Sequence, residues 1–138
     1  MDFVLDASVA AAWVLEDEQS NLADQIIDSL ATKTAVAPHL WALETSNILL
    51  VAERRGRIDS GKRKLMIEAI RDLGVIEEPQ PQRITFGAVQ DLAAKHLLSS
   101  YDASYLELAV RLGLPLATLD QPLRKAAMQE NVPLVESV

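Results

Sequence analysis

The chain has 138 residues, of which 49% are hydrophobic and 24% are charged. This composition is typical of a globular protein, and the length fits one domain covering residues 1–138. Twenty acidic residues against thirteen basic ones give a net charge of −7, so non-specific phosphate binding alone would explain its function poorly. The chain has no cysteine, which excludes disulfides, thiolate metal sites and cysteine nucleophiles.

The sequence gives no sign of a membrane segment or a secretory signal. No apolar run approaches the ~20 residues that span a bilayer. The N-terminus lacks the basic and then apolar layout of a signal peptide. We therefore expect a cytoplasmic protein that makes no membrane contact.

The first segment places an aspartate directly after an apolar run. Phe3, Val4 and Leu5 lead into Asp6, and a helical pattern begins at Ser8. A run this short before a helix predicts a buried parallel strand. Ligands of open α/β sheets bind beyond the carboxyl ends of such strands, so we expect Asp6 at that edge. The alternative is a helix N-cap, for which Asp is a preferred residue.

The rest of the chain alternates between helical and strand patterns. After a polar turn over residues 16–20, helices are expected over 21–31, 39–55, 60–73, 84–98, 101–112 and 122–130, with Gly56 ending the second of these. Strands are expected over 34–37, 74–77, 114–118 and 132–135, the last an edge strand because it contains Pro133. Alternating strands and helices predict right-handed βαβ units and an α/β fold, with a mainly parallel five-stranded sheet covered by helices on both faces.

The helix over 39–55 contains a carboxylate in an unusual position. A helical wheel at 100° per residue places Glu44 and Asn47 within an apolar face formed by Leu40, Leu43, Ile48 and Val51. A buried carboxylate without a partner costs several kcal/mol, so Glu44 needs one. The partner is either an arginine, Arg54 or Arg55, or a metal ion.

Asp102 shows the same conflict on the helix over 101–112. It lies at the centre of an apolar stripe, while solvent is expected on the side of Ser104, Glu107 and Arg111; the stripe consists of Tyr105, Leu106, Leu108, Ala109, Val110 and Leu112. A capping box beginning at Ser99 is the structural alternative. Capping explains a carboxylate in the first turn but not one that faces the core, so we favour a functional role.

Asp120 repeats the arrangement seen at Asp6, since it follows a predicted strand and precedes a helix. Alone it is an N-cap. Together, the four carboxylates of Asp6, Glu44, Asp102 and Asp120 would repel one another strongly unless divalent cations neutralise them. A site with only oxygen ligands favours Mg²⁺ or Mn²⁺ over zinc.

The basic residues are concentrated in one short window, between the helices over 39–55 and 60–73. This window is either a solvated corner between two helices or a binding patch for RNA or a protein partner; it contains Arg54, Arg55, Arg57, Lys62, Arg63 and Lys64.

Four segments together resemble the PIN-domain nucleases, especially the VapC-like toxins of toxin–antitoxin pairs. They are residues 4–8 (VLDAS), 43–49 (LETSNIL), 101–109 (YDASYLELA) and 117–120 (ATLD), and the resemblance covers nearly the whole chain. It implies a single PIN-like domain with sheet order 3-2-1-4-5, in which the first and fourth strands are neighbours. Asp6 and Asp120 would then flank the crevice where the strand order reverses.

The resemblance also implies roles for individual residues. Asp6, Glu44, Asp102 and Asp120 take the positions of the family's acidic metal site. Three further residues match its supporting positions: Ser8, Asn47 and Thr118. The chain departs from the pattern at Pro122, where some relatives carry another acid.

By this resemblance the protein would hydrolyse RNA with Mg²⁺ or Mn²⁺, form a homodimer and bind a small antitoxin. Trp13 and Trp41 are expected to pack in the core. A non-catalytic PIN-like module that binds RNA or protein is the main alternative. A phosphatase of the haloacid dehalogenase type fits less well because it needs a second aspartate where this chain has Ser8. A receiver domain fits less well still.

Overall fold

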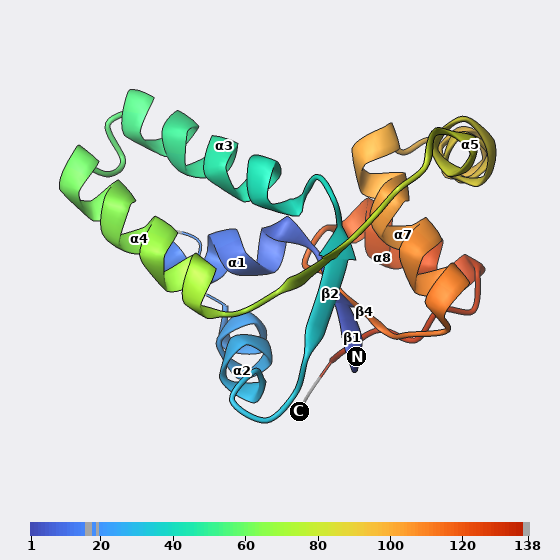
Figure 1. The fold of residues 1–138 in the computed structure, drawn as a ribbon, viewed down its shortest axis with the longest axis horizontal. Coiled ribbons are helices and arrows are strands. Elements are labelled where there is room, and N and C mark those ends of the chain that lie inside the picture. The colour runs from blue at the N-terminus through green and yellow to red at the C-terminus, as the bar shows by residue number, and fades with distance from the viewer. Residues whose placement is uncertain (16–17, 19, 137–138) are drawn as a thin grey trace.

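The computed structural model describes residues 1–15, 18 and 20–136, so most of the polar turn expected over 16–20 lies outside the described residues. Its sheet has four parallel strands, in the order β3-β2-β1-β4 (Figure 1). They are β1 (Phe3–Leu5), β2 (Ala35–Pro38), β3 (Ile76–Glu78) and β4 (Leu116–Ala117). The predicted α/β class and the pairing of the first and fourth strands are confirmed.

The fifth strand expected over 132–135 does not form in the described part of the chain. Leu134 makes only an isolated parallel bridge to Leu116. Backbone hydrogen bonds join Leu116 N to Pro133 O at 2.8 Å and Val135 N to Leu116 O at 3.0 Å. Pro133 has no N–H to donate, which limits how far this segment can pair. The prediction of five strands is therefore wrong by one.

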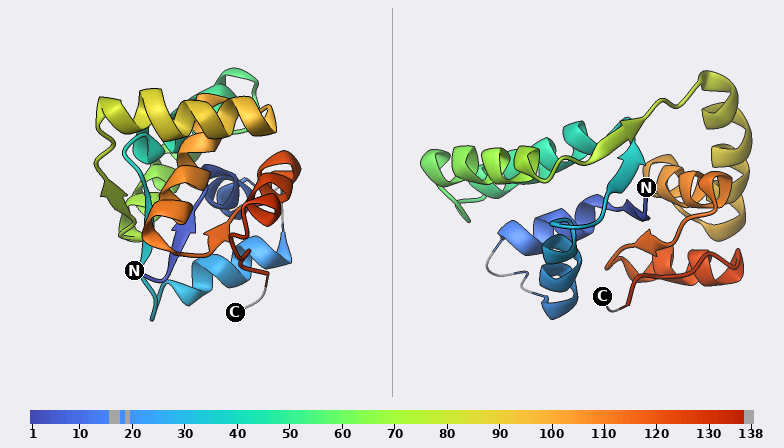
Figure 2. Two further views of the ribbon diagram at one scale, coloured as in Figure 1. Left: turned by 90° about the vertical axis from the view of Figure 1, so that its right-hand side faces the viewer. Right: turned by 60° about the horizontal axis from the view of Figure 1, so that its bottom comes forward.

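Helices cover both faces of the sheet. On one side lie α1 (Ala7–Val14), α2 (Asn21–Ser29), α3 (Trp41–Arg54) and α4 (Ser60–Asp72) (Figures 1 and 2). On the other lie α5 (Gln82–Ile84), the π-helix η2 (Thr85–Val89), α6 (Gln90–His96), α7 (Ser100–Leu112) and α8 (Gln121–Gln129). None of these helices combines the length and apolar character needed to cross a membrane.

The core follows from the uninterrupted apolar run of β1. Val4 and Leu5 are fully buried because helices cover both faces of the central strand. Trp41 is buried and Trp13 is partly buried against the same core, as expected. Helix α3 ends as predicted, with Gly56 at φ +75°, a conformation that glycine adopts without steric cost.

The predicted buried faces of α3 and α7 are only partly correct. Leu43 is 77% exposed, because the buried side of α3 is instead formed by Trp41, Thr45, Leu49 and Ala52. On α7 the expected stripe is buried over residues 105–109, but Val110 is exposed.

The side of α7 that was expected to face solvent is exposed at Arg111, as predicted, but is covered at Ser104 and Glu107. Ser104 and Glu107 are buried because α7 packs between the sheet and the α6–η2 layer. Glu107 accepts two hydrogen bonds from the Arg111 guanidinium, at 2.8 and 3.2 Å, and Ser104 Oγ donates to Ser100 O at 2.8 Å. These hydrogen bonds satisfy polar side chains that the helical wheel had predicted to be exposed to solvent.

Candidate active site

The candidate site lies where β1 and β4 end side by side. Asp6 directly follows β1, and its backbone N–H donates to Ala117 O at 2.9 Å. Thr118 directly follows β4. Parallel strands bring their carboxyl ends to one edge, so residues separated by more than a hundred positions meet there.

Asp6 is held by two hydroxyl groups and no positive charge in the described structure. Its carboxylate is 4% exposed, and its Oδ2 accepts hydrogen bonds from Ser8 Oγ and Thr118 Oγ1, each at 2.7 Å. Ser8 Oγ in turn accepts from the backbone N–H of Leu119 at 3.1 Å. Although Asp6 occupies the N-cap position of α1, its side chain makes no capping bond. The capping alternative is therefore wrong for this side chain.

Glu44 is fixed by a tyrosine rather than by an arginine. The hydroxyl of Tyr105 on α7 donates to Glu44 Oε1 at 2.6 Å. Arg54 and Arg55 are exposed at the far end of α3, about 15–16 Å along the helix at 1.5 Å per residue. Across residues 1–15, 18 and 20–136, the ion pairs do not include any of the four candidate carboxylates.

Asp102 and Asp120 both stand at helix N-termini, but in different ways. The Asp102 backbone N–H donates to Ser99 Oγ at 3.1 Å, which forms the first half of the expected capping box. Asp120 is the N-cap of α8, and its Oδ2 accepts from Leu123 N at 3.0 Å. The Asp120 N–H also donates to Thr118 Oγ1 at 3.1 Å. The capping alternative is thus confirmed for Asp120, which uses one carboxylate oxygen for it.

The acidic groups influence one another electrostatically. Burial raises the pKa of Asp6, the hydrogen bonds from Ser8 and Thr118 oppose that rise, and the charges of Asp102 and Asp120 add to it. Burial likewise raises the pKa of Glu44, opposed by the Tyr105 hydrogen bond and reinforced by Asp6 and Asp102. The pKa of Asp102 is raised by burial and then by the charge of Asp120. The four carboxylates therefore share one region of negative potential.

The donor set has the chemistry of a site for a hard divalent cation. Carboxylate and hydroxyl oxygens are the ligands that Mg²⁺ and Mn²⁺ prefer, and the acids lack the cationic partners that buried carboxylates otherwise require. In the described part of the chain, however, no three acidic or histidine residues already lie close enough to hold one ion. The residues fit in kind, and binding by three of them requires their side chains to move closer.

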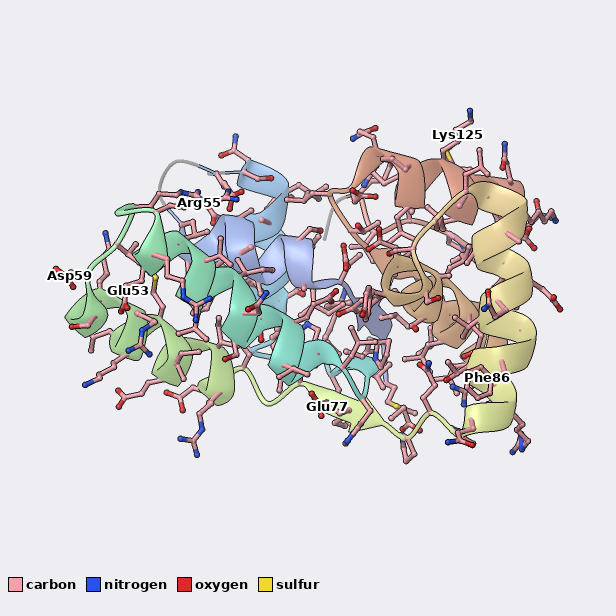
Figure 3. The ribbon with its side chains drawn as sticks, turned by 90° about the horizontal axis from the view of Figure 1, so that it is seen from above. Glu53, Arg55, Asp59, Glu77, Phe86 and Lys125 are labelled. Atoms are coloured by element: carbon pink, nitrogen blue, oxygen red, sulfur yellow. The ribbon has the colours of Figure 1, made fainter. Side chains whose placement is uncertain are left out.

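Asn47 and the basic window lie in different surroundings. Asn47 is exposed on α3, three residues after Glu44, and lines the same groove as Glu44. The basic window surrounds the far end of the α3–α4 hairpin, and Figure 3 shows Arg55, Glu53 and Asp59 at this end of the molecule. Arg63 Nε pairs with Glu53 at 2.7 Å, and Arg57 lies 3.8 Å from Glu18. The window is therefore not in contact with the four carboxylates.

Sequence reasoning assigned Tyr105 to the core and missed its second role. Tyr105 is fully buried, yet its hydroxyl reaches Glu44 and also interacts with the backbone of Ala7. Burial and the neighbouring charges of Asp6 and Glu44 raise the pKa of this phenol far above its ordinary value, so it remains a proton donor. The available signal was its position three residues after Asp102, on the same helix face, because a buried tyrosine hydroxyl needs a partner.

Comparison with known proteins places this arrangement in a family. A model of the PIN domain matches residues 3–128. The chain belongs to the PIN domain family. The resemblance indicated by the four sequence segments is thereby confirmed.

One curated protein and one solved structure that resemble this PIN domain both come from Pyrobaculum aerophilum. Over 123 residues the chain is 29% identical to Ribonuclease VapC3 of Pyrobaculum aerophilum, covering 89% of this chain and 92% of that protein. The crystal structure of PAE2754 from Pyrobaculum aerophilum has the same fold, with a TM-score of 0.68 and 24% identity, covering all of this chain and 88% of the other.

The raised pKa of Asp102 leads to a prediction about the stability of this PIN domain. An acid whose pKa is raised by folding contributes to the free energy of unfolding below its unfolded pKa of about 4. This contribution is lost as the pH rises through the pKa of the folded state. In EDTA at neutral pH, Asp102→Asn should therefore increase the free energy of unfolding, by about 1 kcal/mol. The gain should disappear below about pH 4, and urea denaturation across this pH range measures it.

Asp24→Asn is the matched control, since Asp24 is an exposed acid in the first turn of α2. It should leave the stability within about 0.5 kcal/mol of the wild-type value. A loss of stability in Asp102→Asn would show that helix capping outweighs the unfavourable charge at this position.

Proposed function

We propose that this PIN domain is a divalent-metal-dependent endoribonuclease, and that it is the toxin of a type II toxin–antitoxin system. The observation that carries the proposal is the set of four carboxylates from four separate segments, in which the charges of Asp102 and Asp120 act on Asp6 and those of Asp6 and Asp102 act on Glu44. In the described residues no cationic side chain is paired to any of the four. Similarity to a protein named Ribonuclease VapC3 supports RNA as the substrate. Membership of the PIN family favours this reading over the phosphatase alternative.

In the proposed mechanism the four acids would hold Mg²⁺ or Mn²⁺, whose positive charge would attract the scissile phosphate to the site. The bound cation would lower the pKa of a water molecule and stabilise charge on the departing oxygen. Asp6 is best suited to act as a metal ligand held in a fixed position, because Ser8 and Thr118 hydrogen-bond to its Oδ2 and leave Oδ1 for coordination. Tyr105 orients Glu44 in the same way, leaving Oε2. Asp120 keeps one oxygen beyond its capping bond.

Partners follow from the same proposal. An antitoxin would inhibit the enzyme by covering the carboxylates, and a homodimer is the expected assembly by resemblance to the family. The basic window, with exposed Arg54, Arg55 and Lys64, is proposed to bind either RNA or the antitoxin. RNA running from the carboxylates to this window would extend along α3, over about 15 Å at 1.5 Å per residue.

Cleavage of RNA by the purified protein tests the activity. Wild type should cleave in Mg²⁺ or Mn²⁺ and stop in EDTA, while Asp6→Asn and Asp102→Asn should each lower kcat/KM by at least ~100-fold, about 2.7 kcal/mol of transition-state stabilisation. The exposed-acid variant Asp24→Asn should cleave like wild type. Equal cleavage by all four proteins would point to a contaminant or to a different site.

Removing the phenol that holds Glu44 provides a test of positioning. Tyr105→Phe keeps the ring in the core but removes the hydrogen bond, so the Mg²⁺ concentration for half-maximal cleavage should rise about ten-fold, the effect typical of losing a group that orients a metal ligand. Excess Mg²⁺ should restore most of the rate. Tyr101→Phe is the matched control and should leave the Mg²⁺ dependence unchanged. An unaltered Mg²⁺ dependence in Tyr105→Phe would remove Glu44 from the metal site.

Expression in cells tests the toxin assignment separately. The wild-type chain should arrest growth, and Asp102→Asn should not. Co-expression with the product of the adjacent upstream gene should restore growth, measured as colony counts after induction. Arrest by both proteins would show that toxicity does not depend on the carboxylates, and harmless wild-type expression would favour a relative without toxin activity.

A further inference from the structure

An apolar groove opens directly beside the candidate carboxylates. It has a volume of about 510 Å³ and is lined by Leu40, Leu43, Glu44, Asn47 and Tyr101. Glu44 thus belongs to both the groove and the acidic site. Leu43 is 77% exposed and Tyr101 is 65% exposed, although both are large and largely apolar. Exposed apolar side chains gathered around a groove mark an interaction surface rather than a random feature of the surface.

Tyr101 occupies this groove because of its position on α7. It is the residue before Asp102, in the first turn of the helix, so the acid and the aromatic ring are carried by the same rigid segment. Tyr105, one turn later, is fully buried, which contrasts with the exposed Tyr101. The two tyrosines therefore have different roles. Tyr105 orients Glu44 by a hydrogen bond from the core, whereas Tyr101 faces the solvent in the groove that Glu44 lines.

The chemistry of the groove suits a nucleobase better than a phosphate. Its lining contains no lysine or arginine, and Glu44 would repel a phosphate that no cation neutralises. Tyr101 offers an aromatic face for stacking, Leu40 and Leu43 offer apolar contacts, and the amide of Asn47 can both donate and accept hydrogen bonds to a base edge. A larger groove of about 640 Å³ beside Lys95 and Lys125 is lined by none of the four carboxylates.

Resting on the proposed ribonuclease function, we propose that Tyr101 is the stacking platform for a nucleobase next to the cleaved bond. The nucleotides on either side of the scissile phosphate are covalently attached to it, so one of them must lie beside Glu44 once the phosphate reaches the acids. Stacking on Tyr101 requires that this base is unpaired. Tyr101 is thus a substrate-binding residue that selects flexible or looped RNA.

Kinetics on a short single-stranded RNA with one mapped cleavage site test this proposal. Tyr101→Ala should raise KM about ten-fold, within the range measured for base–aromatic stacking, and leave kcat within about two-fold, because stacking acts equally before and during the reaction. Tyr101→Phe keeps the ring and should match wild type. Phe86→Ala is the matched control, since Phe86 is an aromatic residue that is 71% exposed on η2 and does not line the groove.

Abasic substrates identify the contact. Replacing the base on one side of the cleaved bond by an abasic ribose should raise KM about ten-fold for wild type and have little further effect on Tyr101→Ala, since the same contact is removed twice. Equal losses in both proteins would overturn the proposal, as would normal KM values for Tyr101→Ala. If Tyr101→Ala keeps its RNA kinetics but escapes inhibition by the antitoxin, the groove belongs to the protein partner and the proposal also fails.

Binding measurements separate this proposal from the proposed activity. Fluorescence anisotropy of the labelled RNA, with Mg²⁺ and with EDTA, compares wild type with Tyr101→Ala and Tyr101→Phe. If wild type binds the RNA without cleaving it, and only Tyr101→Ala binds more weakly, the stacking platform stands and the nuclease assignment falls. If wild type neither binds nor cleaves the RNA, both fall.

Discussion

A carboxylate buried between two hydroxyl groups sets the organisation of this protein. Asp6 is almost completely buried at the end of the central strand, and its hydrogen-bond partners, Ser8 and Thr118, are both neutral. Two hydroxyl donors lower the cost of the charge but do not remove it, because the pKa of Asp6 stays above its ordinary value. A fold built only for stability would replace such a group, and the proposed cation site gives a reason for its presence.

The parallel sheet explains why these acids can meet. β1 and β4 are neighbours although more than a hundred residues separate them, and Thr118 connects the two by bonding to Asp6 and to the backbone of Asp120. The hydrogen bond from Leu123 N to Asp120 Oδ2 caps α8 and, at the same time, fixes the direction in which the other carboxylate oxygen of Asp120 points. Pro122 lies in the first turn of the same helix, so the proposed site has no further acid two residues after Asp120.

The positions of residues at the ends of strands could be predicted from the sequence, because they follow directly from which residues come after an apolar run. Asp6 and Asp120 follow apolar runs, and any parallel arrangement of those runs brings their ends to one edge. For residues 132–135 the sequence showed Pro133 and indicated an edge strand, but it could not show how many backbone bonds the segment makes to Leu116. The fold class and the choice of the four candidate acids therefore came from sequence patterns and family resemblance, whereas the extent of the sheet depended on pairing that only the structure shows.

Helical wheels were less reliable, because they assume that one face of a helix is buried. Helix α7 is covered on more than one side, so Glu107 is buried where solvent was expected and is satisfied by Arg111. On α3, Leu43 was assigned to the core beside Glu44 but is exposed. The helical wheel correctly placed Leu43 close to Glu44, but it could not show that the two residues line an exposed groove rather than the core.

Glu44 lies between the acidic site and the apolar groove beside it. Glu44 stands on the boundary, with Tyr105 on its buried side and Leu43 on its open side. The ligand proposed for this position is charged where it meets the carboxylates and apolar where it meets the groove. A phosphodiester joined to an aromatic base has both properties in one molecule, whereas a free inorganic ion has only the first. For the same reason the net charge of −7 does not exclude RNA, since in the proposed complex a cation would neutralise the acids locally and the neighbouring contact would be with a neutral base.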